Sequence, residues 1–186
     1  MKKLKASLQI VTIVAVLVMM LVPIGCEKQS PIAPAEVSSK VVKTSDQIRF
    51  LKNVNPGFAK TFLVSEWVTV ASGGLVTVGD ENCGHSFLDF LPGDLPADTT
   101  ITFGWDSNGY ITDLMPHGIV FNSPVELALS YKDADLSGLV EDSLRIWYFN
   151  DNTNLWELVG GTVNTTDKVV EGYIEHFSRY ALGDAP

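Results

Sequence analysis

The chain has 186 residues, with 22 acidic and 13 basic side chains, so its formal net charge is 13 − 22 = −9. This length accommodates one ordinary domain and a leader, but not two large catalytic domains. The acidic balance argues against a nucleic-acid binder, because such proteins neutralise phosphates with a concentrated Lys/Arg surface.

The N-terminus has the pattern of an export signal. Lys2, Lys3 and Lys5 precede an apolar run over residues 10–24. A basic start, a short apolar segment and a small residue before the cleavage point are typical of a secretory signal peptide. An uncleaved membrane anchor is the alternative, but the run is shorter than the roughly 20 apolar residues that a membrane-spanning helix prefers. We therefore predict a signal peptide over residues 1–25.

Cys26 follows directly after this run and resembles the lipidated cysteine of bacterial lipoproteins, although Pro23 stands where that motif usually has Leu. The resemblance implies cleavage before Cys26 and attachment of acyl chains to its side chain. Two or more such chains anchor a protein stably to a membrane. We therefore expect an exported protein that is lipid-anchored in a bacterial envelope, at the inner or the outer membrane.

Removal of the leader changes the charge and leaves two further regions. The leader holds three lysines and no acid, so the exported part carries 10 − 22 = −12. Residues 26–46, rich in Ser, Pro and Ala, are predicted to form a flexible tether, because they bury too little apolar surface to offset their ordering entropy. Residues 47–186 are predicted to form a single domain. If Cys26 is acylated, Cys83 has no disulfide partner, and we interpret it as a small buried residue.

From about residue 48 onward, apolar residues alternate with polar ones and turn residues separate the runs. Ile101, Phe103 and Trp105 share one face of such a run, and the cluster of Asn and Asp over 150–154 predicts a hairpin turn. No helical period of useful length is present. The pattern favours an all-β fold, an antiparallel sandwich or barrel, and the length suffices for two packed sheets. The expected strands lie near residues 62–70, 75–78, 99–105, 125–131, 144–149, 155–159, 169–174 and 179–182.

Several short segments also resemble one family in their linear order. They are Gly-Gly-Leu-Val-Thr-Val at 73–78, Ser-Phe-Leu-Asp-Phe at 86–90, Leu-Pro-Gly-Asp-Leu at 91–95, Ile-Thr at 101–102, Pro-Val-Glu-Leu at 124–127, Arg-Ile-Trp-Tyr-Phe at 145–149 and His-Phe-Ser at 176–178. This order is similar to the ZU-five domain of zonula occludens proteins, Unc-five netrin receptors and ankyrins, over about residues 66–183. The resemblance implies an antiparallel β-sandwich that contacts other proteins and turns over no substrate. We therefore expect a non-enzymatic interaction or scaffolding module without a cofactor, whose partner is an unidentified envelope protein.

The tripeptide His176-Phe177-Ser178 raises a second function. In some ZU-five domains a His-Phe-Ser sequence cleaves itself between Phe and Ser. By that resemblance the Ser178 hydroxyl would attack the carbonyl of Phe177, and His176 would accept the hydroxyl proton. Water would then hydrolyse the resulting ester. The alternative is a closing strand in which His176 and Ser178 make local hydrogen bonds.

A third possibility is a calcium- or carbohydrate-binding module that uses the acidic loops or exposed aromatic residues. Asp133, Asp135 and Ser137 stand at positions 1, 3 and 5 of a calcium-loop pattern, with Glu141 and Asp142 nearby. Position 12, where such a loop has a bidentate Glu, is Leu144. A solvated acidic loop is therefore the simpler interpretation. Cys83, His85 and His117 match no standard zinc spacing.

Overall fold

The computed structural model describes residues 40–184. They belong to one compact unit. The predicted signal peptide, Cys26 and the tether up to residue 39 lie outside the described residues. Within residues 40–184, no helix has the length and apolar character needed to cross a membrane.

The described chain is mostly strand, with three short 3-10 helices. The helices are η1 (Ser45–Gln47), η2 (Pro56–Phe58) and η3 (Glu141–Ser143). The strands are β1 (Val42–Lys43), β2 (Arg49–Phe50), β3 (Thr61–Val68), β4 (Gly74–Asp80), β5 (Gly84–Phe90), β6 (Thr99–Asp106), β7 (Ile111–Met115), β8 (Val120–Ser130), β9 (Arg145–Asn150), β10 (Leu155–Gly160), β11 (Thr162–Asn164), β12 (Val169–His176) and β13 (Arg179–Asp184).

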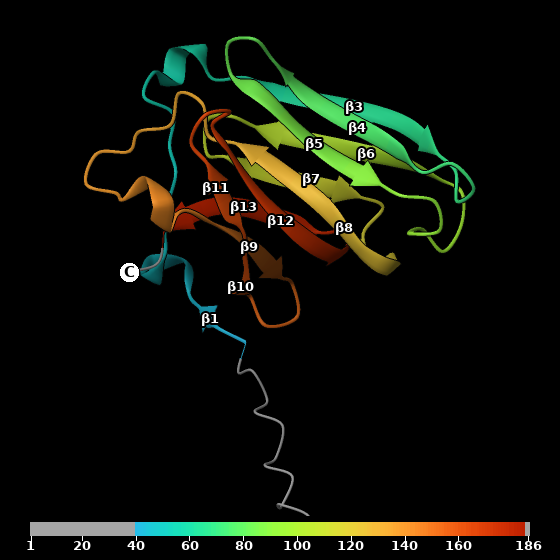
Figure 1. Cartoon of the computed structure of the whole chain (residues 1–186). Coiled ribbons are helices and arrows are strands. Elements are labelled where there is room, and N and C mark those ends of the chain that lie inside the picture. The colour runs from blue at the N-terminus through green and yellow to red at the C-terminus, as the bar shows by residue number, and fades with distance from the viewer. Residues whose placement is uncertain (1–39, 185–186) are drawn as a thin grey trace, which may run out of the picture. The chain divides into compact units, whose positions relative to one another are not determined.

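These strands form two antiparallel sheets that pack face to face (Figure 1). The eight-stranded sheet has the order β1-β10-β9-β13-β7-β6-β3, and β2 pairs with β13 beside this path. The five-stranded sheet has the order β11-β12-β8-β5-β4. The prediction of an all-β antiparallel sandwich is therefore confirmed.

The main core lies between the inner faces of the two sheets. In β6, Ile101, Phe103 and Trp105 are buried while their neighbours along the strand are partly exposed. This is the period-two alternation expected of a strand with one face against a core. Leu88 of β5 and Leu127 of β8 face them from the other sheet, and both are fully buried.

A second, smaller apolar cluster forms around β9, β10 and β13. Trp147, Trp156 and Ala181 are buried there against Ile48, with Phe50 also in contact. The face of the eight-stranded sheet that carries Trp147 and Ala181 is opposite to the face that carries Tyr148 and Tyr180, since successive strand residues point to opposite sides. The segment from η1 to β2 thus supplies a cover for the outer face of this sheet.

The domain begins earlier than the sequence predicted. Residues 40–46 were assigned to a flexible tether, yet Val42 and Lys43 form β1 and pair with Glu157 and Trp156 of β10. In addition, the Leu158 amide donates to the Val41 carbonyl oxygen at 2.9 Å. The composition of this segment resembles that of a linker, but pairing at a sheet edge satisfies its backbone groups. The boundary between tether and domain is therefore corrected to about residue 39.

Two of the glycines in the motif segments lie in turns and have a positive φ. Gly73 has a φ of 65° between β3 and β4, and a Cβ there would lie 2.0 Å from the Phe90 carbonyl oxygen. Gly93 has a φ of 94° directly after Pro92, where the chain leaves β5. Both positions need the backbone freedom of glycine, which supports a structural role for these motifs.

Candidate functional site

A concavity with aromatic, acidic and basic side chains lies where the chain passes from one sheet to the other. Strand β12 belongs to the five-stranded sheet and β13 to the eight-stranded sheet. Only Phe177 and Ser178 separate them. The Phe177 amide donates to the Ile119 carbonyl oxygen at 3.1 Å, and the Leu114 amide donates to the Ser178 carbonyl oxygen at 3.0 Å. Hydrogen bonds on both sides therefore hold this crossing segment.

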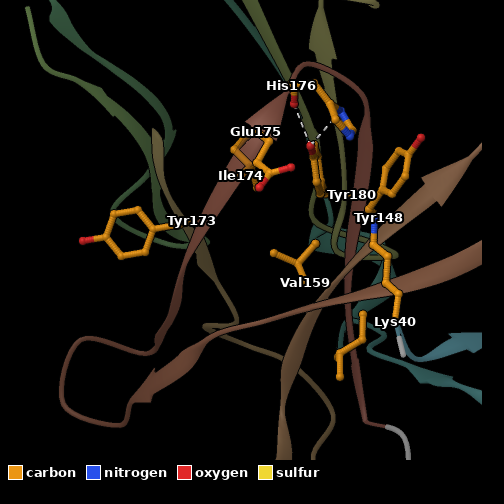
Figure 2. A pocket seen from close by; sticks show the side chains of 9 residues that line it. Lys40, Tyr148, Val159, Tyr173, Ile174, Glu175, His176 and Tyr180 are labelled. Atoms are coloured by element: carbon orange, nitrogen blue, oxygen red, sulfur yellow. Dashed lines mark hydrogen bonds between the residues drawn. The ribbon is translucent and has the colours of Figure 1, made fainter. Parts of the chain in front are cut away.

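A cleft of about 170 Å³ opens beside the crossing segment (Figure 2). Strand β12 contributes His176, β13 contributes Tyr180, and β9 contributes Tyr148. Lys40 approaches from the start of the domain, and Figure 2 shows its side chain extending toward Tyr148. The complete lining consists of Lys40, Tyr148, Leu158, Val159, Tyr173, Ile174, Glu175, His176 and Tyr180.

Three rings form one wall of the cleft. The Tyr148 and His176 ring centroids are 4.6 Å apart in an edge-to-face arrangement, and those of Tyr148 and Tyr180 are 5.9 Å apart. The Tyr180 hydroxyl donates to the His176 carbonyl oxygen at 2.6 Å. The same hydroxyl lies 3.3 Å from His176 Nδ1 (Figure 2). Tyr180 therefore determines the position of both the backbone and the imidazole of His176.

An ion pair lies at the side of this wall. Lys40 Nζ is 2.5 Å from Glu157 Oε2 and 5.5 Å from the centroid of the Tyr148 ring. The Asn150 amide donates to Glu157 Oε1 at 2.6 Å. Glu157 and Tyr148 are cross-strand partners in β10 and β9, so their side chains stand on the same face of the sheet. Glu157 as a whole residue is only 8% exposed, and its carboxylate has a partner on each oxygen.

Burial and charge shift the ionisation of these groups. Burial lowers the pKa of His176, and the nearby Lys40 ammonium lowers it further. Burial acts to raise the pKa of Glu157, but the hydrogen bonds from Lys40 and Asn150 outweigh it and the net shift is downward. Burial, followed by the Glu157 charge, raises the pKa of Tyr148. At neutral pH these lowered pKa values favour a neutral His176 imidazole in the cleft and an ionised Glu157 carboxylate beside it.

The geometry of the crossing segment differs from the one that self-cleavage requires. The Ser178 hydroxyl donates to the Phe149 carbonyl oxygen at 3.5 Å, while Tyr180 is the hydrogen-bond partner of His176. Residues 176–178 all have negative φ. Ser178 is 6% exposed and Phe177 2% exposed. The structure therefore brings the three residues into one segment without pairing the proposed base with the proposed nucleophile.

No model of a protein family matches the chain, and no curated protein matches its sequence.

The predicted calcium residues do not converge. Asp135 accepts hydrogen bonds from the Ser137 amide and hydroxyl, and Asp133 lies at a turn with a φ of 62°. Glu141 instead accepts hydrogen bonds from Lys168 and from the Tyr131 hydroxyl, each at 2.7 Å. Among residues 40–184, no three His, Cys, Asp or Glu side chains are grouped closely enough to hold a metal ion.

The calcium-loop prediction, which included Asp142, therefore gains no support from the described residues. Of its acidic side chains, Asp135 has Ser137 as a donor, Glu141 has Lys168 and Tyr131, and the candidates are not grouped around a common centre.

The residues considered for zinc are also separate. His85 Nε2 lies 3.6 Å from Glu81 Oε1, and His117 Nε2 lies 2.8 Å from Asp113 Oδ1. Cys83 is buried with 3% exposure, which confirms its interpretation as a small interior residue.

The sequence did not indicate four residues of the cleft and its neighbouring ion pair, namely Lys40, Tyr148, Glu157 and Tyr180. Lys40 stood in the range assigned to the tether. Tyr148 and Glu157 stood in predicted strands, and their alternation with Trp147 and Trp156 was the one available signal. That alternation separates the two faces but does not tell which face meets the other sheet.

Proposed function

We propose that this protein is an exported lipoprotein whose β-sandwich serves as a non-enzymatic protein-interaction or scaffolding module. The single observation that carries the anchoring is the position of Cys26. It follows a basic start and a short apolar run, where bacterial lipoproteins have their acylated cysteine. The acyl chains would hold the protein to the membrane, and the sandwich would be displayed on a tether of residues 26–39.

Two observations support an interaction role for the sandwich. The order of its motifs resembles the ZU-five domain, a module that acts through contacts with other proteins. The two residues with the strongest catalytic potential, His176 and Ser178, each have a different hydrogen-bond partner within the domain. This arrangement suits a structural role for the crossing segment better than a catalytic one.

Membrane fractionation with a Cys26→Ser variant tests the anchoring. We expect the unaltered protein in the membrane fraction with a covalently bound acyl label, and the variant in the soluble fraction without the label. Cys83→Ala is the matched control, because the chain has two cysteines and this variant retains Cys26. A Cys26→Ser protein that still partitions with membranes would contradict the proposal.

Cross-linking in native membranes, followed by mass spectrometry, tests the interaction role. A partner that is recovered with the anchored protein and lost from the Cys26→Ser protein would support a module that acts at the envelope. Recovery of no cross-linked partner across the growth conditions of the source cell would count against it.

Self-cleavage between Phe177 and Ser178 is the second candidate function, because burial keeps His176 neutral and therefore able to accept a proton. It requires rotation of the Ser178 hydroxyl away from Phe149.

A further inference from the structure

The pair formed by Lys40 and Glu157 combines features that proteins use to bind an external cation. Glu157 is a nearly buried carboxylate whose Oε1 is oriented by Asn150 at 2.6 Å. Its other oxygen and the Tyr148 ring both face one ammonium group, at 2.5 Å and 5.5 Å respectively. A carboxylate beside an aromatic face is a strong site for a lysine ammonium.

The ammonium group that fills this site is that of Lys40, a residue of the same chain. The Lys40 side chain is 58% exposed, although the side chain of its partner Glu157 is 11% exposed. The adjoining backbone is held by the two pairs of β1 with β10 and by the bond between Val41 and Leu158. The ammonium of Lys40 is thus the most easily displaced component of the site.

Space is available next to the pair for a second side chain. The cleft of about 170 Å³ is lined by Lys40 together with Val159, Ile174 and the three rings. Apolar and aromatic walls suit the methylene stem of a lysine, and the carboxylate suits its head. The net charge of −12 on the exported part favours the approach of a cationic partner over long distances.

We propose that this cleft is a binding site for a lysine side chain of a partner protein, and that Lys40 occupies the site until the partner displaces it. The incoming ammonium takes the position of Lys40 against Glu157 and Tyr148, and its stem lies along the wall formed by Tyr180 and His176. No charge is left unpaired in the exchange, because Lys40 moves into solvent as the ligand enters. The proposal rests on the interaction role in one respect, namely that the lysine comes from a protein.

Occupation of the site by Lys40 lowers the apparent affinity of the site for an external lysine, and this effect can be measured. A competing group on the same chain has a high effective concentration, so the apparent affinity for a free ligand falls by the fraction of open sites. Removal of Lys40 therefore strengthens binding of an external lysine. Removal of the Glu157 charge abolishes binding in either background.

Calorimetric titration of the purified full chain with N-acetyl-lysine methylamide tests the site. We expect the Lys40→Ala protein to bind this probe with an affinity about tenfold higher than the unaltered protein. The double variant Lys40→Ala/Glu157→Gln should lose the gain. The uncharged N-acetyl-norleucine methylamide, which has the same four-carbon stem without the ammonium, should not bind any of these proteins. Equal affinity of the unaltered and Lys40→Ala proteins would overturn the proposal, and so would binding of the norleucine probe.

Lys60 provides a matched control. Its Nζ pairs with Asp80 at 2.6 Å and lies 6.0 Å from the Phe62 ring, so it has the same two kinds of partner. Asp80 is 30% exposed, and the pair is outside the cleft. Lys60→Ala should therefore not improve probe binding, and an equal improvement would contradict a specific site at Glu157.

A second measurement covers the case in which Glu157→Gln unfolds the domain. Tyr148→Leu in the Lys40→Ala background keeps the carboxylate and removes the aromatic face, and it should weaken probe binding several-fold. Undiminished binding by this variant would overturn the role of Tyr148. These titrations do not depend on membrane attachment. Failure of the lysine site and failure of the anchoring at Cys26 therefore give separate results.

Discussion

The Tyr180 hydroxyl donates a 2.6 Å hydrogen bond to the backbone carbonyl oxygen of His176, and the bond joins the first residues of β13 to the end of β12. These two strands belong to different sheets, so the bond bridges the two layers of the sandwich where the chain crosses between them. Tyr180 is 1% exposed, which makes its hydroxyl a buried donor that has found its partner.

Tyr180→Phe should lower the free energy of unfolding by about 1–2 kcal/mol, since it removes a buried hydrogen bond and leaves the His176 carbonyl without this donor. Urea unfolding at neutral pH measures the change. Tyr173→Phe is the control, because Tyr173 is 66% exposed and should be neutral. Equal stabilities of the Tyr180→Phe and unaltered proteins would show that water replaces the lost donor.

Phe177→Ala should be the more damaging change in the crossing segment. The Phe177 ring is buried between Phe121 and Phe90, with centroid distances of 4.7 Å and 6.1 Å. Truncation of a buried Phe typically costs about 3–5 kcal/mol, so we expect a large drop in the urea midpoint. Phe58→Ala, at a ring that is 79% exposed, should change stability by less than about 0.5 kcal/mol. A small effect of Phe177→Ala would mean that the pocket collapses around the missing ring.

The depressed pKa of His176 predicts a loss of stability on the acid side of neutrality. Burial disfavours the charged imidazole in the folded state, while the unfolded chain titrates near the ordinary value of 6.5. As the pH falls below about 7, the unfolded chain binds more protons than the folded one, so the free energy of unfolding falls. The change continues until the pH reaches the lowered folded pKa.

Urea midpoints at pH 7.5 and pH 5.5 measure this dependence. The unaltered protein should lose stability between the two values, and His176→Gln should lose less. His117→Gln should retain the full dependence, since His117 is exposed. If His176→Gln and the unaltered protein lose stability equally, another group is responsible.

Intact-mass measurement of the purified protein addresses self-cleavage. With the Ser178 hydroxyl directed to Phe149 and His176 held by Tyr180, we expect one uncleaved species, and the same result for Ser178→Ala. A shorter species that ends at Phe177 and disappears in Ser178→Ala would reverse this expectation. Cleavage would release the nine residues from Ser178 to Pro186.

Strands with one buried and one exposed face were predictable from the sequence. In β6 the apolar residues alternate strictly, and the expected range of 99–105 agrees with the observed Thr99–Asp106. Strand β7 was not expected, because Ile111 and Met115 on its exposed face are themselves apolar and remove the alternation. Strand β1 is too short to produce any periodic signal.

The cleft could not be predicted from the sequence, because its lining depends on the order and the register of the strands. Lys40 and Glu157 are far apart along the chain and meet only because β1 pairs with β10. Glu157 and Tyr148 share a face because Leu155 pairs with Asn150 across the hairpin. A shift by one residue would have placed Trp156 opposite Tyr148 and turned Glu157 to the other face. The Asn/Asp cluster indicated the turn but not this register.

The pairing of β2 with β13 has a mechanical consequence. Gly183 is the strand partner of Phe50, and Arg49 Nη2 forms an ion pair with Asp184 Oδ2 at 2.5 Å. Strands β2 and β13, from the beginning and the end of the domain, are therefore joined. A pulling force on the chain at Lys40 would first strip away the two-residue strand β1. Further load would reach β2, where ladder hydrogen bonds and an ion pair resist it together. A protein held at its N-terminal side could thus yield at β1, lengthen by a few residues and keep its sandwich intact.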